Sequence, residues 1–238
     1  MKKNLTGAFC ATLSLGLFTA GVLTTEAAHA AEDVTVEPGF FVAGSVGGNF
    51  QRNDPFRVTS PTGNSRIFND YKDDVGFTVA VGYQYDRPVV SFLKFLKPRF
   101  ELEYNFARAE LRGASGRLRT DYVKGLLYSD IRWAQDQRII PYFGTGIGIG
   151  RVDAEFQGLT QSPAGAAVSI NDSTTRFSTH SSLGVTIKAT ERFDLYAEGR
   201  YSRTLGVKFD ALDAVGTPLS IKSKAQAFGL GIGARARF

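Results

Sequence analysis

The sequence predicts an all-β fold: an eight-stranded antiparallel up-and-down transmembrane β-barrel, preceded by an N-terminal signal peptide helix. Three observations predict it. The chain begins with a secretory leader, and the remainder has no helical periodicity of useful length. Instead, segments of about ten residues alternate apolar and polar side chains, which is typical of membrane barrels. Aromatic residues gather at the ends of these segments, where lipid headgroups would lie.

The leader occupies the first thirty residues. Lys2 and Lys3 precede the apolar run GAFCATLSLGLFTAGVL, and a small-residue cleavage motif, AHA, ends at Ala30. The apolar run is shorter than the ~20 residues that a spanning helix needs. We therefore expect residues 1–30 to be a cleaved Sec signal peptide, residues 31–39 a periplasmic tail, and residues 40–238 the barrel.

Composition excludes several classes of protein. Cys10 is the single cysteine and lies in the leader, so the exported chain lacks the residues for a disulfide scaffold or a zinc site. We expect no metal and no cofactor. The net charge of +5 is spread over strands and connections, without an aromatic stacking platform, which argues against nucleic acid.

Eight strands are expected, and an even number places both ends of a bacterial barrel on the periplasmic side. The connections after the first, third, fifth and seventh strands are rich in Gly, Ser, Asn, Asp and Pro, so we expect extracellular loops over 51–74, 112–121, 153–176 and 206–223. The expected strands cover residues 40–50, 75–85, 99–111, 122–133, 142–152, 177–189, 193–205 and 224–238.

Each expected strand has an apolar outer face and a small or polar inner face. In the third strand, for example, Leu102 points outward and Glu103 inward. The fourth strand points Tyr128 inward, whereas Tyr122 is counted among the outward aromatics near the extracellular surface. The membrane-interface aromatics are expected to include Tyr83, Tyr85, Phe100, Trp133, Phe228 and Phe238.

The inner faces carry charges of both signs. An eight-stranded barrel is just wide enough to be filled by side chains, and buried charges persist when they are paired. We expect Arg132 to pair with Glu101 and Glu103, and Glu198 to pair with the arginines of the last strand. The expected lumen network comprises Glu101, Glu103, Asp130, Arg132, Lys188, Glu198, Arg200, Arg235 and Arg237.

Together these segments resemble the porin-like outer-membrane barrels that include opacity proteins, rickettsial-type surface antigens and the OmpA barrel domain. The resemblance is carried by GFFVAGSVGGNF, VGFTVAVGYQYD, RFELEYNFARAEL, PYFGTGIGIGRV, ERFDLYAEGRYSR and the terminal GLGIGARARF. It implies a bacterial outer-membrane location and a non-enzymatic role in adhesion or envelope integrity. It also implies insertion by the outer-membrane assembly machinery, which reads the C-terminal strand ending at Phe238.

The same pattern indicates the partners of the barrel. We expect a monomer in contact with outer-membrane lipid and lipopolysaccharide, and a host or envelope ligand at the loops. The cations that would face lipopolysaccharide are Arg52, Arg57, Arg66 and Lys72.

No catalytic residue is expected, although the sequence leaves room for an enzyme. That enzyme would be a lipid A-modifying hydrolase, because His180 and Ser182 resemble the His-x-Ser element of lipid A deacylase barrels and Glu198 could orient the histidine. A narrow solute channel and a soluble lipocalin-like barrel are also compatible with eight alternating strands.

Overall fold

The computed structural model describes residues 37–60, 63–68, 70–72, 74–88, 92–112, 115–160 and 167–238. The expected signal peptide and most of the expected tail lie outside these ranges. The cleavage site at Ala30 therefore stays a prediction.

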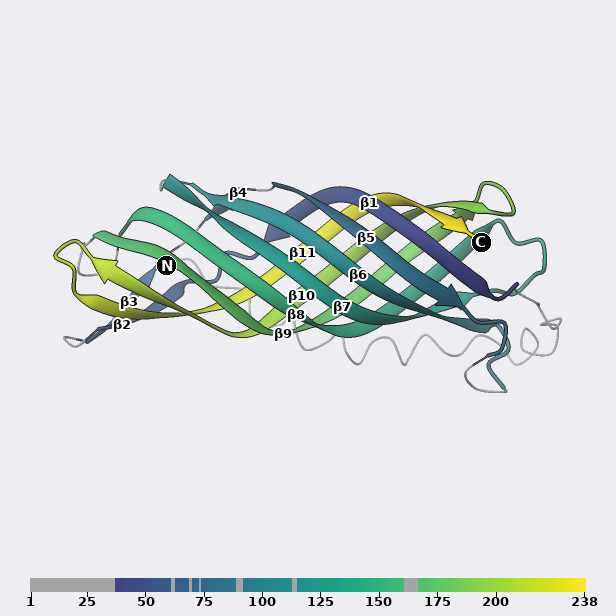
Figure 1. The fold of residues 1–238 in the computed structure, drawn as a ribbon, viewed down its shortest axis with the longest axis horizontal. Helices are drawn as coiled ribbons and strands as arrows, with labels where there is room; N and C mark the ends of the chain where they lie inside the picture. The colour runs from purple at the N-terminus through teal and green to yellow at the C-terminus, as the bar shows by residue number, and fades with distance from the viewer. Residues whose placement is uncertain are drawn as a thin grey trace, which may run out of the picture.

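Eight long strands form a closed ring. Consecutive long strands pair antiparallel, and β1 closes the ring by pairing with β11. Figure 1 shows an elongated cylinder of strongly tilted strands, with the C-terminus at the end where β1 begins. The ring strands are β1 (Gly39–Gln51), β5 (Asp74–Gln84), β6 (Leu96–Leu111), β7 (Ser115–Ile131), β8 (Ile139–Thr160), β9 (Ala167–Lys188), β10 (Phe193–Asp213) and β11 (Pro218–Arg237). The predicted eight-stranded antiparallel barrel is confirmed.

Several ring strands are longer than a membrane requires. A spanning strand needs about 9–11 residues, whereas β8 and β9 have 22 each and β10 has 21. The sequence-based loops are therefore wrong: much of 112–121, 153–176 and 206–223 continues the neighbouring strands. The ring extends as a β-stranded wall past the end of the expected spans.

The first expected loop, residues 51–74, is also partly stranded. It contains β2 (Phe56–Ser60), β3 (Gly63–Ile67) and β4 (Tyr71–Lys72). β2 pairs with β11, β3 pairs with β2, and β4 pairs with β6. These short strands widen the sheet at the end of the barrel opposite the C-terminus, as Figure 1 shows.

Two parts of the barrel differ in their outward side chains. The apolar belt is the part between an aromatic row containing Phe100, Trp133 and Phe193 and a second row containing Phe106 and Phe228. The distal wall is the part beyond the second row, made of the remaining ends of β6–β11 together with β2, β3 and β4. No helix in the described ranges is long and apolar enough to cross a membrane.

The apolar belt has hydrocarbon side chains outside and charged side chains inside. Leu230 and Ile232 are 53% and 68% exposed, whereas Arg235 and Glu198 are 3% and 5% exposed. This arrangement is the reverse of a soluble barrel, so the lipocalin-like alternative is wrong. Tyr122 is a correction to one expected orientation: it is 4% exposed, because it shares the inward face of β7 with Tyr128.

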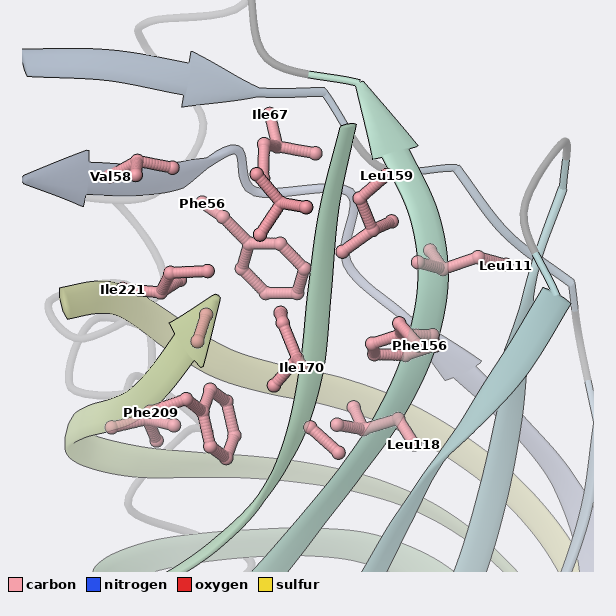
Figure 2. Packing of buried hydrophobic residues seen from close by; sticks show 14 of the residues in the cluster. Phe56, Val58, Ile67, Leu111, Leu118, Phe156, Leu159, Ile170, Phe209 and Ile221 are labelled. Atoms are coloured by element: carbon pink, nitrogen blue, oxygen red, sulfur yellow. The ribbon is translucent and has the colours of Figure 1, made fainter. Parts of the chain in front are cut away.

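The distal wall has the opposite arrangement. Its inward side chains form an apolar core contributed by all the strands of the wall, and Figure 2 shows Phe56, Phe156, Ile170, Phe209 and Ile221 directed toward one another. Each of these five is at most 1% exposed. The core lies inside the part of the barrel farthest from the C-terminus.

Candidate functional site: the lumen and the distal wall

The lumen of the apolar belt is filled by ion pairs. Nearest the termini, Asp130 lies 3.3 Å from the Nε of Arg99 and 3.5 Å from Arg132. On the facing strands, Arg235 lies 3.4 Å from Glu101 and 3.7 Å from Asp194. Further pairs join Arg99 to Glu101 and Arg237 to Asp194. The carboxylates therefore each contact at least two guanidinium groups, which offsets part of the cost of burying charge.

A second group of charges lies deeper in the belt. Glu103 is 3.0 Å from the Nζ of Lys124 and 3.9 Å from Arg200, and Arg200 also pairs with Glu198. Tyr128 links the two glutamates, because its hydroxyl donates to Glu103 at 3.0 Å and lies 3.3 Å from Glu198. The network thus crosses the lumen from β6 to β10.

The two pairings expected from the sequence are wrong. Glu101 lies opposite Leu126 in the β6–β7 register, whereas Arg132 comes six residues later, just past the end of β7, and pairs with the nearby Asp130. Glu198 lies opposite Gly231, whereas Asp194 lies opposite Arg235.

The structure also adds members that sequence reasoning left out. These are Arg99, Lys124 and Asp194, each at most 3% exposed. The alternation itself could have identified them, because each lies an even number of residues from an assigned inward position. Lys188 is half-buried and forms no ion pair with another described residue.

Glycines on the inner face make room for tyrosines more than for charges. A Cβ at Gly144 would collide with the ring of Tyr128, and a Cβ at Gly233 would collide with Tyr196. The Tyr128 ring also stacks edge-on against Tyr142 and lies 4.3 Å below the guanidinium of Arg99. The small residues therefore allow aromatic side chains to support the arginines, by cation–π attraction as well as by packing.

His180, Ser182 and Glu198, the residues of the hydrolase alternative, do not form the hydrogen bonds that a catalytic arrangement would need. His180 is 2% exposed, and its two ring nitrogens lie 2.8 Å from the hydroxyls of Ser178 and Ser202. Ser182 shares its strand face but is not among these partners. Glu198 is engaged by Arg200 and by the hydroxyl of Tyr142 at 3.2 Å. His180 points into the lumen, away from the lipid-facing surface.

The expected interface aromatics lie on the outer surface. Tyr83 contacts Phe40 and Tyr85, with ring centroids 4.9 Å apart in both cases. The others are between 45% and 81% exposed: Tyr85, Phe100, Trp133, Phe228 and Phe238. Phe228 belongs to the row beside the distal wall, and the remaining members surround the end with the C-terminus. Their contact with headgroups stays a prediction.

A family model for the outer membrane protein beta-barrel domain matches residues 11–235. The chain belongs to this outer-membrane barrel family. The apolar belt of this outer-membrane barrel is therefore its membrane-spanning part. The distal wall lies beyond one edge of this membrane-spanning part.

Two solved structures show the same fold as this outer-membrane barrel at low identity. Neisserial surface protein A is 15% identical, with a TM-score of 0.50, over 85% of this chain and all of the other. OprG from Pseudomonas aeruginosa is 10% identical, with a TM-score of 0.51, over 84% of this chain and 96% of the other. The outer membrane enzyme PagL is 10% identical, with a TM-score of 0.38, over 83% of this chain and 99% of the other. No curated protein sequence matches the chain.

Proposed function

We propose that this protein is a non-enzymatic outer-membrane surface barrel whose distal wall binds host or envelope components. The observation that carries the proposal is the construction of that wall. It is made of paired strands around its own apolar core, so its outer face is a rigid, charged surface held above the membrane. Binding surfaces on rigid scaffolds lose little conformational entropy on association.

The interior supports a sealed barrel. Ions crossing the lumen would meet the ion-paired network of the belt and then the apolar core of the distal wall. An eight-stranded barrel leaves little space beyond its own side chains. In planar bilayers, we expect the purified barrel to give no conductance steps above the lipid background. Stable, reproducible steps would favour a solute channel.

The environment of His180 supports a structural role for this residue. Both ring nitrogens already have hydroxyl partners, and the ring is enclosed by Tyr122 at a centroid distance of 5.2 Å. We expect His180→Ala to leave the lipid A acylation pattern of expressing cells unchanged by mass spectrometry. If lipid A lacks an acyl chain in cells with the native protein and retains it in cells with His180→Ala, the barrel is a hydrolase.

The surface role is tested on intact cells. An epitope inserted at Gly216, in the exposed β10–β11 turn, should be labelled by antibody without permeabilising the cells. Cells expressing the barrel should bind at least one of three immobilised probes better than cells without it: matrix protein, glycosaminoglycan or lipopolysaccharide. Labelling without a gain in binding to any probe would contradict the binding role while retaining the topology.

Assembly is proposed to follow the route expected for the family. The last strand is followed directly by an exposed aromatic residue, Phe238, whose backbone N–H donates to the carbonyl of Phe40 at 3.0 Å. We infer that the assembly machinery reads this strand and releases a monomer. Removing Phe238 should lower the amount of folded barrel in the outer membrane. Unchanged insertion would exclude that residue as part of the signal.

A further inference from the structure

A row of four cations crosses the outer face of the distal wall. Lys208 on β10 lies opposite Lys222 on β11, Lys222 lies opposite Arg57 on β2, and Arg57 lies opposite Arg66 on β3. Cross-strand partners point to the same side of a sheet, and all four residues are exposed. We call these four residues the cation row. With strands ~4.8 Å apart, the row spans about 14 Å.

The apolar core fixes the position of this row. On the same strands, the inward neighbours are Phe209, Ile221 and Val58, each at most 1% exposed, and Figure 2 shows them inside the distal wall. A slip of one residue would move these side chains into solvent and the cations into the core. The wall therefore cannot separate the four charges by changing its register.

The row is unfavourable without a ligand, because like charges that lie directly opposite destabilise a sheet. None of its four members forms an ion pair or side-chain hydrogen bond with another described residue. Two carboxylates of the described residues lie near one end of the row: Asp210, two residues beyond Lys208, and Asp172, which accepts a hydrogen bond from the backbone N–H of Asp210 at 2.8 Å. Neither forms an ion pair with Lys208. On another side of the wall, by contrast, Arg117 lies 3.2 Å from Glu155 and Arg151 lies 2.8 Å from Asp153.

Two further cations connect the row to the membrane. Arg203 and Lys224 are exposed on β10 and β11, between the row and the aromatic residues Tyr201 and Phe228. Lys222 comes six positions before Phe228 on β11. For a strand tilted by ~40°, this places Lys222 about 15 Å farther than Phe228 from the membrane centre, measured along the barrel axis. The cations thus form a continuous track from the headgroup level upward, as an anionic ligand anchored in the same membrane would require.

We propose that the cation row binds phosphate groups on the core saccharide of a lipopolysaccharide molecule in the same membrane. Arg203 and Lys224 reach toward the phosphates nearest the lipid. Phosphate oxygens accept paired hydrogen bonds from arginine and attract lysine as a point charge, so they can neutralise several neighbouring cations at once. This inference rests on the proposed binding function of the distal wall and names its partner.

The test compares two double variants with the same change in net charge. Lys208→Gln/Lys222→Gln removes half of the row, and Arg117→Gln/Arg151→Gln removes two exposed, ion-paired arginines elsewhere. The probe is purified lipopolysaccharide with a phosphorylated core, and the measurement is its affinity for the detergent-solubilised barrel. We expect the row variant to bind roughly tenfold more weakly, with the control variant near the native affinity.

Two further probes identify the source of the anion. Lipopolysaccharide that lacks core phosphates should bind both variants and the native barrel about equally. A soluble sulfated polysaccharide should bind more weakly than phosphorylated lipopolysaccharide. Equal losses in both variants would show unspecific charge attraction, and stronger binding of the sulfated polysaccharide would show a ligand from outside the cell. Either result overturns the proposal.

Lys222→Glu separates ligand binding from folding. A glutamate here would lie between Lys208 and Arg57, so the variant should unfold at a higher temperature than the native barrel in lipopolysaccharide-free detergent. The same variant should bind phosphorylated lipopolysaccharide more weakly than the native barrel does. A lower melting temperature or unchanged binding would contradict the proposal. Antibody labelling of intact cells does not depend on the row, so it still reports separately on the proposed surface function.

Discussion

The apolar belt and the distal wall are successive parts of the same strands, and they exchange the chemistry of their two faces. Along β8, the outward residues change from Ile147 and Ile149 to Arg151 and Asp153. The inward residues change from glycines to Val152, Ala154 and Phe156. The two-residue alternation of the strand continues through this change. The medium outside the barrel therefore decides which face is apolar, and strand geometry permits either choice.

The comparison also shows two ways of filling one barrel. In the belt, hydrocarbon on the outside leaves little reason for apolar residues inside, and paired charges and tyrosines fill the lumen. In the distal wall, water outside makes the interior the place to bury apolar surface, as in a soluble protein. The two parts should respond differently to the same kind of substitution.

The largest effect is expected from breaking a buried ion pair in the belt. Lys124→Met leaves the buried carboxylate of Glu103 with Arg200 as its remaining cation, at 3.9 Å. Removing one partner of a buried pair costs about 3–5 kcal/mol of unfolding free energy. Urea unfolding of the barrel in lipid vesicles measures it. The matched double variant Glu103→Leu/Lys124→Met should recover most of the lost unfolding free energy. If the single and double variants lose equal stability, Lys124 does not stabilise the barrel through its pairing with Glu103.

A cavity in the distal wall should have a comparable but local effect. Ile170 is 1% exposed in the apolar core, and truncating it to alanine costs about 2–5 kcal/mol. Because the belt has its own contacts, the loss should appear in the wall alone. Hydrogen exchange should therefore quicken in the distal ends of β8–β10 and stay slow in the belt. Uniform quickening along these strands would show that the two parts unfold as one unit.

The same outward arginine should have different effects at two heights. Leu102→Arg places a charge in the lipid-facing belt and should cost about 2–4 kcal/mol. Ser169→Arg places it on the exposed outer face of β9 in the distal wall, opposite the uncharged Leu212, where a change within about 0.5 kcal/mol is expected. Unfolding titrations of both variants in vesicles make the comparison. Similar costs at the two positions would place the membrane boundary elsewhere.

Alternation in the sequence was sufficient to predict the ring and the orientation of most belt side chains. It placed Tyr128, Asp130 and Arg132 on an inward face, and the structure buries all three, the first two on β7 and Arg132 just after it. It could not predict the partners, because a register shift of two residues preserves every orientation and changes every cross-strand neighbour. Glu198 illustrates this limit, since the registers of β10 place it opposite Gly231 and Gly184 and bring no arginine of β11 to it.

The distal wall was missed for a different reason. A strand was taken to end soon after its outward apolar residues end, so the residues from Asp153 onward were interpreted as a loop. The signal was nevertheless present: Val152, Ala154 and Phe156 alternate with charged residues, and Val207 and Phe209 do the same around Lys208. When the apolar residues move from the outer to the inner face of a strand and the two-residue alternation continues, the sequence predicts a barrel that extends beyond the membrane.

The smallest effect is expected at the tip of the distal wall, where a turn like those of soluble proteins joins β10 to β11. Hydrogen bonds from the backbone N–H of Thr217, at 2.7 Å, and of Val215, at 3.0 Å, lower the pKa of Asp213. A lowered folded-state pKa stabilises the turn above the ordinary aspartate value of about 3.9, and this contribution is lost as the pH falls through the lowered value. Between pH 7 and pH 5 the turn should therefore keep constant hydrogen-exchange protection, once intrinsic exchange rates are corrected. Asp213→Ala should reduce that protection at both pH values without affecting the apolar belt, and an equal reduction in the belt would contradict the independence of the two parts.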